Sequence, residues 1–115
     1  MERFNEYASF TLTTAIYRET CKTPEARIIY CLLGLVGETG EVAEKFKKLL
    51  RGGGKMVDLY RDPAIAAELG DVFWYLCRLS SELGFNISEE VIAANVEKLR
   101  SRQERGKIHG EGDNR

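Results

Sequence analysis

Two pairs of acidic residues are the side chains of this chain best placed to do chemistry. Glu38 and Glu41 lie three residues apart, and so do Glu68 and Asp71. Side chains at this spacing share one face of a helix. Each pair also borders a run of apolar residues. If the two segments pack as antiparallel helices, all four carboxylates can therefore meet beside the core.

Carboxylates that lie this close together repel each other, and this repulsion must be relieved. Two like charges about 4 Å apart repel by roughly 4 kcal/mol at an effective dielectric constant of 20. Glu38, Glu68 and Asp71 have no basic residue three or four positions away, and only Glu41 has one, Lys45. Converging carboxylates must then protonate, splay apart or bind cations. A set of ligands made only of oxygen suits a hard divalent ion, Mg²⁺ or Mn²⁺.

Other residue types give no competing site. A di-iron bundle needs two Glu-x-x-His motifs, and the only histidine is His109, close to the C-terminus. The three cysteines lack CxxC spacing, which argues against a zinc site or a disulfide framework. We expect Cys31 and Cys77, which lie in apolar runs, to be buried. We interpret Glu44 and Lys48 as an ordinary surface pair.

Four helices are predicted to position the acidic pairs. Apolar residues recur at three- and four-residue steps over about 2–19, 24–51, 63–83 and 88–105. Thr23 before Pro24, and Asp62 before Pro63, are typical helix starts. Ser88 is the expected start of the last helix, and glycines at 52–54 and 84 are expected to end the two middle ones.

Short links between these helices predict an all-α fold, an antiparallel four-helix bundle. We expect a domain over residues 1–105 and a polar, glycine-rich tail over 106–115. Phe73, Trp74 and Tyr75 point in three directions around one helix, and the core of one chain is not expected to take all three rings. This favours a homo-oligomer, a homodimer or homotetramer, over a monomer with one exposed ring.

Glycines recur near the acidic pairs. Gly34, Gly37 and Gly40 lie at every third position of the second predicted helix, and Gly70 precedes Asp71. A glycine inside a helix costs up to about 1 kcal/mol relative to alanine. Their presence predicts close backbone approach beside the carboxylates, with a local kink as the alternative.

Composition narrows the classes of partner. The 115 residues carry a net charge of −1, which gives no electrostatic footprint for duplex nucleic acid or anionic lipid. No apolar run approaches the roughly 20 residues that a membrane span needs. Residues 1–10 mix charges with aromatic residues, unlike a signal peptide. We therefore expect a cytoplasmic protein.

Two segments carry a family resemblance. GLVGETGEVAEK at residues 34–45, followed by AELGDVFWYL at 67–76, resembles the MazG-like all-α nucleoside triphosphate pyrophosphohydrolases. The signature of that family is Glu-x-x-Glu, a spacer and Glu-x-x-Asp.

The resemblance extends along most of the chain. Residues 14–17, TAIY, are similar to the first-helix segment of the family, and Asn95-x-x-Lys98-x-x-x-Arg102 resembles its last-helix motif. The GEGDNR ending at 110–115 is similar to the tails of small phage and bacterial members. Arg18 departs from the pattern, because close relatives carry proline there.

The resemblance implies an activity and a site. Members of the family hydrolyse (d)NTPs between the α- and β-phosphates and release the monophosphate and pyrophosphate. The metal ligands that it implies here, for Mg²⁺ or its substitute Mn²⁺, are Glu38, Glu41, Glu68 and Asp71. It implies substrate contacts at Asn95, Lys98 and Arg102. Glu41 or Glu38 is the expected general base.

Two rings are further candidates for contact with the substrate. Trp74 or Tyr75 could stack on the base of the nucleotide, although packing within the core or an interface is the more ordinary use of such rings.

Two alternative functions stay open beside a broad pyrophosphohydrolase. The chain could be a relative with a narrower substrate, similar to dUTPases, dCTPases or phosphoribosyl-ATP pyrophosphohydrolases. A non-catalytic helical oligomerisation module is the third possibility.

Overall fold

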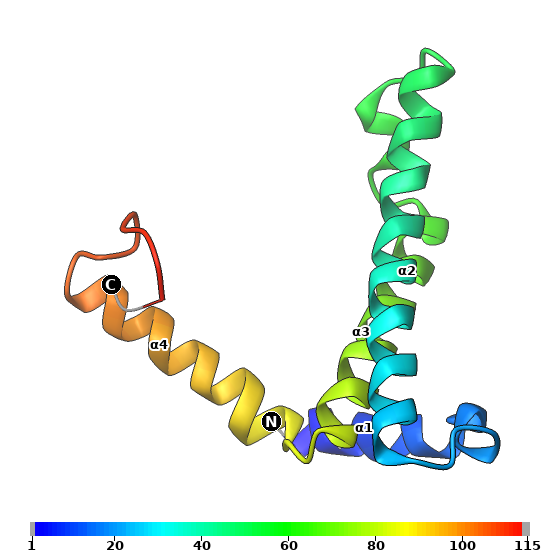
Figure 1. The fold of residues 1–115 in the computed structure, drawn as a ribbon. Coiled ribbons are helices and arrows are strands. Elements are labelled where there is room, and N and C mark those ends of the chain that lie inside the picture. Colours follow the sequence, from blue (N-terminus) through cyan, green and yellow to red (C-terminus); the bar gives the residue numbers. More distant parts are fainter. Residues whose placement is uncertain (1, 114–115) are drawn as a thin grey trace.

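The computed structural model describes residues 2–113, all of whose regular structure is helical. The elements are α1 (Glu2–Thr13), η1 (Ile16–Glu19), α2 (Pro24–Arg51), η2 (Met56–Leu59), α3 (Pro63–Glu82), η3 (Ile87–Ile92) and α4 (Ala93–Glu104) (Figure 1). Asn114 and Arg115, which end the GEGDNR segment, lie outside the described residues. The all-α prediction is confirmed. None of these helices combines the length and apolar character that crossing a bilayer requires.

The two middle helices begin where the sequence predicts. The Thr23 side chain accepts a hydrogen bond from the Ala26 N–H at 3.1 Å, and Asp62 accepts one from Ala64 at 2.9 Å. These caps satisfy N–H groups that the first turn of a helix leaves free. From these starts α2 and α3 run antiparallel as one long hairpin, which holds the most extensive helix–helix contact of the chain (Figure 1).

The first helix is shorter than predicted. α1 ends at Thr13 rather than near residue 19, and the 3₁₀ turn η1 follows it. The hydroxyls of Thr11 and Thr13 donate to carbonyls three residues earlier, each at 2.6 Å, and such bonds compete with a regular helix. Ala15, at φ −84° and ψ 64°, then leaves helical geometry. The change of direction lays buried Tyr17 against α2 and α3.

The last helix also differs from its prediction at the start. Asn86, not Ser88, provides the cap, because its side chain accepts hydrogen bonds from the N–H groups of Ser88 and Glu89 at 3.0 and 2.9 Å. The first six residues form the π-helical segment η3, and regular α4 begins only at Ala93.

The described chain does not form the closed four-helix bundle that its short links predict. α1 crosses the base of the α2–α3 hairpin, whereas α4 projects away from the hairpin and packs mainly on η3 (Figure 1). The radius of gyration is 17.2 Å, against roughly 13 Å for a compact chain of this length. Within residues 2–113, the buried apolar side chains are only Ala15, Tyr17, Cys31, Cys77 and Ile87. Burial of the two cysteines confirms their prediction.

The three consecutive rings of α3 all find partners within the chain. Phe73 packs on α1, Trp74 on η1 and Tyr75 on α2. Their ring partners are Tyr7, Tyr17 and Tyr30, at centroid distances of 5.2, 6.3 and 6.2 Å. All three rings stay half-buried and none belongs to the buried core, so the structure does not contradict the expectation that the core of one chain cannot take them all. The homo-oligomer stays a prediction.

Candidate functional site

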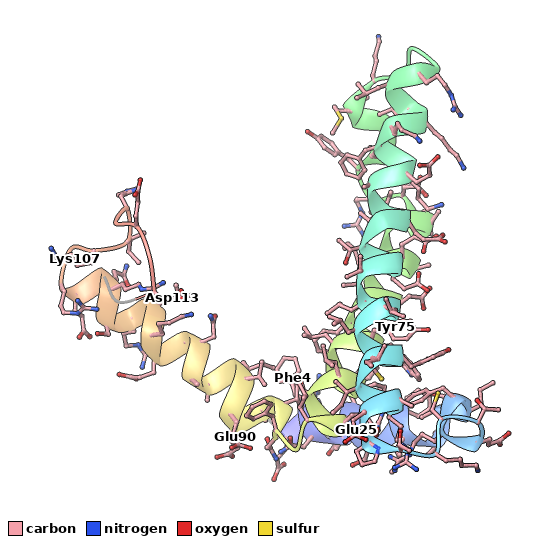
Figure 2. The ribbon with its side chains drawn as sticks, viewed as in Figure 1. Phe4, Glu25, Tyr75, Glu90, Lys107 and Asp113 are labelled. Atoms are coloured by element: carbon pink, nitrogen blue, oxygen red, sulfur yellow. The ribbon has the colours of Figure 1, made fainter. Side chains whose placement is uncertain are left out.

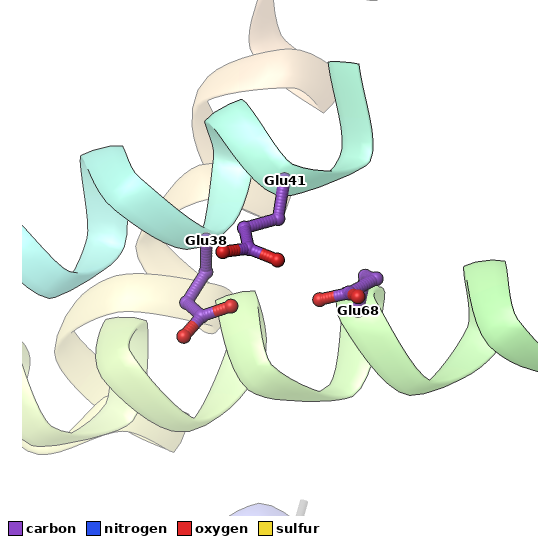
Figure 3. A group of neighbouring side chains, drawn as sticks. All are labelled: Glu38, Glu41 and Glu68. Carbon is purple, nitrogen blue, oxygen red and sulfur yellow. The ribbon is translucent and has the colours of Figure 1, made fainter. Parts of the chain in front are cut away.

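The α2–α3 hairpin brings acidic side chains of both helices together. One carboxylate oxygen from each of Glu38, Glu41 and Glu68 lies within 4.8 Å of the other two (Figure 3). Glu38 and Glu41 are one turn apart on α2, and Glu68 faces them from α3. Glu38 and Glu68 are half-buried, whereas Glu41 is exposed. We call these three residues the glutamate cluster.

Asp71, the fourth predicted ligand, lies at the edge of this site. It is exposed and stands outside the glutamate cluster, but its charge acts on Glu38. Partial burial raises the pKa of Glu38 above its ordinary value, and the negative charges of Asp71, Glu41 and Glu68 raise it further. Asp71 also helps to raise the pKa of Tyr7 on α1, after burial and Cys77. The four carboxylates therefore share one electrostatic environment.

Among residues 2–113, one lysine forms an ion pair with the glutamate cluster. The Nζ atom of Lys45 lies 3.6 Å from an oxygen of Glu68. The sequence suggested Glu41 as its partner, but Lys45 follows Glu38 and Val42 on the side of α2 that meets α3, so it pairs across the hairpin instead. Lys47, not Lys48, contacts Glu44, at 2.9 Å. A single cation leaves the cluster with an excess of negative charge.

The donor set fits a hard divalent cation. The ligand atoms that the cluster offers are all carboxylate oxygens, and they converge from two rigid helices. Mg²⁺ binds through few carboxylates and keeps several waters, which suits a cluster with one exposed member. Glu38, Glu41 and Glu68 could hold such an ion, with Asp71 beside them.

Of the glycines near the acidic pairs, Gly34 has a close neighbour, and that neighbour is a side chain rather than a backbone. A Cβ atom on Gly34 would overlap the ring of Tyr75, so this glycine makes room for that ring of α3. A Cβ atom on Gly37, Gly40 or Gly70 would meet nothing within 4 Å. Close approach within the chain therefore does not explain these three.

Trp74 is engaged in packing. Its indole N–H donates to the Thr14 hydroxyl at 2.8 Å, and its ring lies edge-on to Tyr17 and Tyr75. The half-buried ring thus ties α3 to the turn after α1.

The predicted substrate contacts lie on α4, apart from the glutamate cluster in the single chain (Figure 1). Asn95 and Lys98 are exposed and line an open groove with Phe85 and Glu90. Arg102, in contrast, is 4% exposed, and its Nη2 atom donates to the backbone oxygen of Asp113 at 3.0 Å.

The C-terminal tail encloses Arg102. Figure 2 shows Asp113 lying back alongside α4, and its carboxylate is 3.9 Å from the Arg102 guanidinium. This contact could not be predicted, because a glycine-rich polar tail has no periodicity from which to infer its path.

A buried ionic network was not among the features predicted from the sequence. Glu82 accepts hydrogen bonds from Arg78 and Arg18, each at 3.0 Å, and Arg78 also donates to the Tyr17 hydroxyl at 3.2 Å. The side chains of Arg78 and Glu82 are 3% and 5% exposed. Their four-residue spacing within an apolar helix was the available signal. The network joins η1 to α3.

The fold and the site define an all-α protein with an acidic, oxygen-only candidate metal site between two antiparallel helices. Residues 29–106 match the family model of the MazG nucleotide pyrophosphohydrolase domain. This match covers more than half of the chain and includes the glutamate cluster, Asp71 and the α4 positions. The chain therefore belongs to the MazG nucleotide pyrophosphohydrolase family.

The chain also has a similar protein in a bacteriophage. The Gene 37 protein of Mycobacterium phage L5 is 43% identical over 104 residues, which are 89% of this chain and 90% of the relative. No solved structure matches the chain significantly.

Proposed function

We propose that this protein is a Mg²⁺-dependent nucleotide pyrophosphohydrolase. Its substrates are (d)NTPs, cleaved between the α- and β-phosphates to (d)NMP and pyrophosphate, in the cytoplasm. Family membership supports the reaction class. The observation that carries the proposal is the convergence of Glu38, Glu41 and Glu68 oxygens within 4.8 Å.

Charge explains why this arrangement suits a polyphosphate. A triphosphate is itself strongly anionic, so it cannot approach four carboxylates unless cations lie between them. Glu38, Glu41, Glu68 and Asp71 are the residues that would hold Mg²⁺, with Mn²⁺ as a possible substitute. Bound Mg²⁺ supplies a ligated water of lowered pKa and charge stabilisation for the leaving pyrophosphate.

A glutamate of the cluster serves as general base. Glu38 and Glu41 are the two candidates, and the raised pKa of Glu38 makes its carboxylate a better proton acceptor than a fully solvated one. Half-burial also restricts the rotamers of Glu38 more than those of exposed Glu41.

The α4 residues contact the substrate in this proposal. Lys98 and Asn95 are free to meet phosphate or sugar oxygens from the groove that they line. Arg102 would first have to exchange its bonds to Asp113 for bonds to phosphate. Stacking of a base on Trp74 would use the exposed part of a ring that Tyr17 and Tyr75 already hold.

A panel of canonical and modified (d)NTPs with Mg²⁺ tests the proposal, with monophosphate and pyrophosphate both quantified. Glu38→Gln and Asp71→Asn should each reduce turnover by at least about 100-fold. Glu44→Gln is the matched control, because Glu44 pairs with Lys47 away from the cluster. Its turnover should be unchanged.

The outcomes separate the alternatives. Turnover of a single member of the panel would indicate a narrower-substrate enzyme of the same family. Undiminished pyrophosphate release by both site variants would rule out the assigned site. No release from any substrate would favour a non-catalytic helical module.

A further inference from the structure

Lys45 differs from the other two lysines near the end of α2 in the place of its ammonium group. Lys45 is half-buried on the side of α2 that meets α3, whereas Lys47 and Lys48 are exposed. Its side chain is 33% exposed, against 66% for Lys47. Lys47 pairs along its own helix with Glu44. Lys45 therefore brings a positive charge directly to the glutamate cluster.

The ion pair between Lys45 and Glu68 is loose. Its Nζ–O distance is 3.6 Å, longer than the roughly 2.7–3.2 Å of an N–H···O hydrogen bond. Within residues 2–113, Glu68 has this one ion-pair partner. A pair that is partly exposed and not hydrogen-bonded contributes little to stability. The Lys45 ammonium can consequently leave Glu68 for another partner at small cost.

A divalent cation at the cluster would compete with Lys45 for Glu68. The single charge of Lys45 cannot balance Glu38, Glu41, Glu68 and Asp71, which act together on one another. An ammonium group a few ångströms from a bound divalent ion is repelled by it. Because lysine has a flexible four-carbon stem, Lys45 can move its charge away from Glu68 while α2 and α3 keep their positions.

A phosphate oxygen is the partner that this displaced ammonium would meet. Mg²⁺ typically binds substrate phosphates together with protein carboxylates, so a phosphate would lie close to Glu68. Lysine is a common phosphate ligand, because its ammonium group has three N–H donors that can turn toward the oxygens. The position of Lys45 beside the cluster favours this contact over one with more distant anions.

We propose that Lys45 is an exchangeable counter-ion of the active site. It pairs with Glu68 until a divalent cation takes that carboxylate, and it then binds a phosphate oxygen of the substrate. This assignment rests on the proposed function and adds a substrate contact to it. The contact comes from α2, next to the cluster, whereas the contacts predicted from the sequence, Asn95, Lys98 and Arg102, lie on α4.

An exchangeable counter-ion and a purely structural ion pair differ in what the loss of the Lys45 charge does. Loss of a structural pair would lower stability and leave the affinities for metal and phosphate unchanged. Loss of an exchangeable counter-ion tightens metal binding, because the cation no longer has to displace the ammonium. It also weakens phosphate binding. The two affinities then change in opposite directions.

Titration with Mn²⁺ tests the first half of the proposal without nucleotide or turnover. Lys45→Met removes the charge and keeps an unbranched side chain. In protein stripped with EDTA, with free Mn²⁺ measured by electron paramagnetic resonance, this variant should bind Mn²⁺ at least about threefold more tightly than the native chain. Lys47→Met, which removes an equal charge paired with Glu44, should retain the native affinity.

Calorimetric titration with inorganic tripolyphosphate, in excess Mg²⁺, tests the second half. Lys45→Met should bind this anion at least about tenfold more weakly than the native chain. Lys45→Arg keeps the positive charge and should stay within about threefold of the native affinity. Lys47→Met should match the native chain. Far-UV circular dichroism verifies that all three variants keep their helices.

The outcomes for Lys45 are distinguishable from those for the proposed function. Unchanged or weaker Mn²⁺ binding by Lys45→Met, or equal affinities of this variant and the native chain for tripolyphosphate, would overturn the assignment, even if the native chain hydrolyses (d)NTPs. A native chain that binds both probes and releases no pyrophosphate would contradict the proposed function alone, and the expected shifts in Lys45→Met would still support the assignment. A native chain that binds neither probe would overturn both.

Discussion

Glu38 stands in the field of three other carboxylates, and that field determines how the site responds to change at single residues. Its pKa is raised by partial burial and by the charges of Asp71, Glu41 and Glu68. At neutral pH the Glu38 carboxyl of the unfolded chain is ionised, and folding therefore places this negative charge in an unfavourable environment. The stability linked to this group is present below its unfolded pKa and is lost as the pH rises through the folded pKa.

Glu38→Gln should accordingly stabilise the metal-free protein. The amide keeps the size of the side chain and removes the repulsion, so the melting temperature in EDTA at pH 7 should rise by up to a few degrees. Thermal unfolding followed by circular dichroism, at the same protein concentration for both proteins, measures this change in melting temperature. A fall in the melting temperature would show that the Glu38 carboxylate makes a stabilising contact instead.

Millimolar Mg²⁺ should reverse this difference, so that the native chain has a higher melting temperature than Glu38→Gln. An ion that binds only the folded state raises the melting temperature of the native chain, and the rise should be smaller for Glu38→Gln, which has one fewer charged ligand. Glu44→Gln should show the native increment, because Lys47 holds Glu44 away from the cluster. Equal increments in all three proteins would place the bound ion elsewhere.

The acidic site was largely predictable at this scale. Glu38, Glu41 and Glu68 lie on two helices whose starts are set by local caps at Thr23 and Asp62, and a short link fixes how the helices face each other. Lys45 was not assigned to Glu68, since sequence spacing shows neighbours within a helix but not the residues across from it.

At the scale of elements, local signals located the helices that begin with a cap and a proline, and failed where tertiary contacts intervene. α1 stops at Thr13 because its threonines bond to their own backbone and because Tyr17 turns inward. η3 begins at Ile87 because Asn86 caps it. The hydroxyl of buried Tyr17 accepts a hydrogen bond from Arg78, which is 61 residues later in the chain, so no local stretch of sequence contains both partners.

The ionic network at Glu82 holds these elements together. Glu82→Gln would leave the Arg78 guanidinium buried without its counter-charge, and removing one member of a buried pair costs about 3–5 kcal/mol. Urea denaturation at fixed protein concentration should show a decrease of this order in the free energy of unfolding. Glu44→Gln, at an exposed pair, should change it by less than about 1 kcal/mol. Similar values for the two variants would mean that water reaches Glu82.

At the scale of the whole molecule, the direction of α4 relative to the hairpin could not be predicted from the sequence. Its apolar stripe is thin, and Val96 and Leu99 stay 43% and 44% exposed. A helix without a strong apolar face has little in the single chain to hold it against the hairpin. The prediction of a bundle rested on link lengths, which limit distance but do not supply the burial that closes a bundle. The enclosed core is consequently confined to the base, around Tyr17, Cys31 and Cys77.

That small core makes the stability of the whole chain sensitive to alkaline pH. Burial raises the pKa of the Cys77 thiol from 9.0 to about 11. Burial and a hydrogen bond with Cys31 raise the pKa of Tyr17 from 10.0 to about 12. Between the unfolded and folded values the unfolded chain releases these protons and the folded chain keeps them, so stability falls as the pH rises.

Urea midpoints measured at pH 8, 9, 10 and 11 should therefore decrease above pH 9. Two pKa units at Cys77 correspond to roughly 2–3 kcal/mol, with Tyr17 contributing further above pH 10. In Cys77→Ala the decline between pH 9 and 10 should be shallower, because one of the two buried thiols whose pKa burial raises, Cys31 and Cys77, is absent. A constant urea midpoint of the native chain up to pH 11 would contradict this prediction. Water would then have to reach Cys77 and Tyr17 in the folded state, and the base of the hairpin would not be a closed core that holds α1, α2 and α3 together.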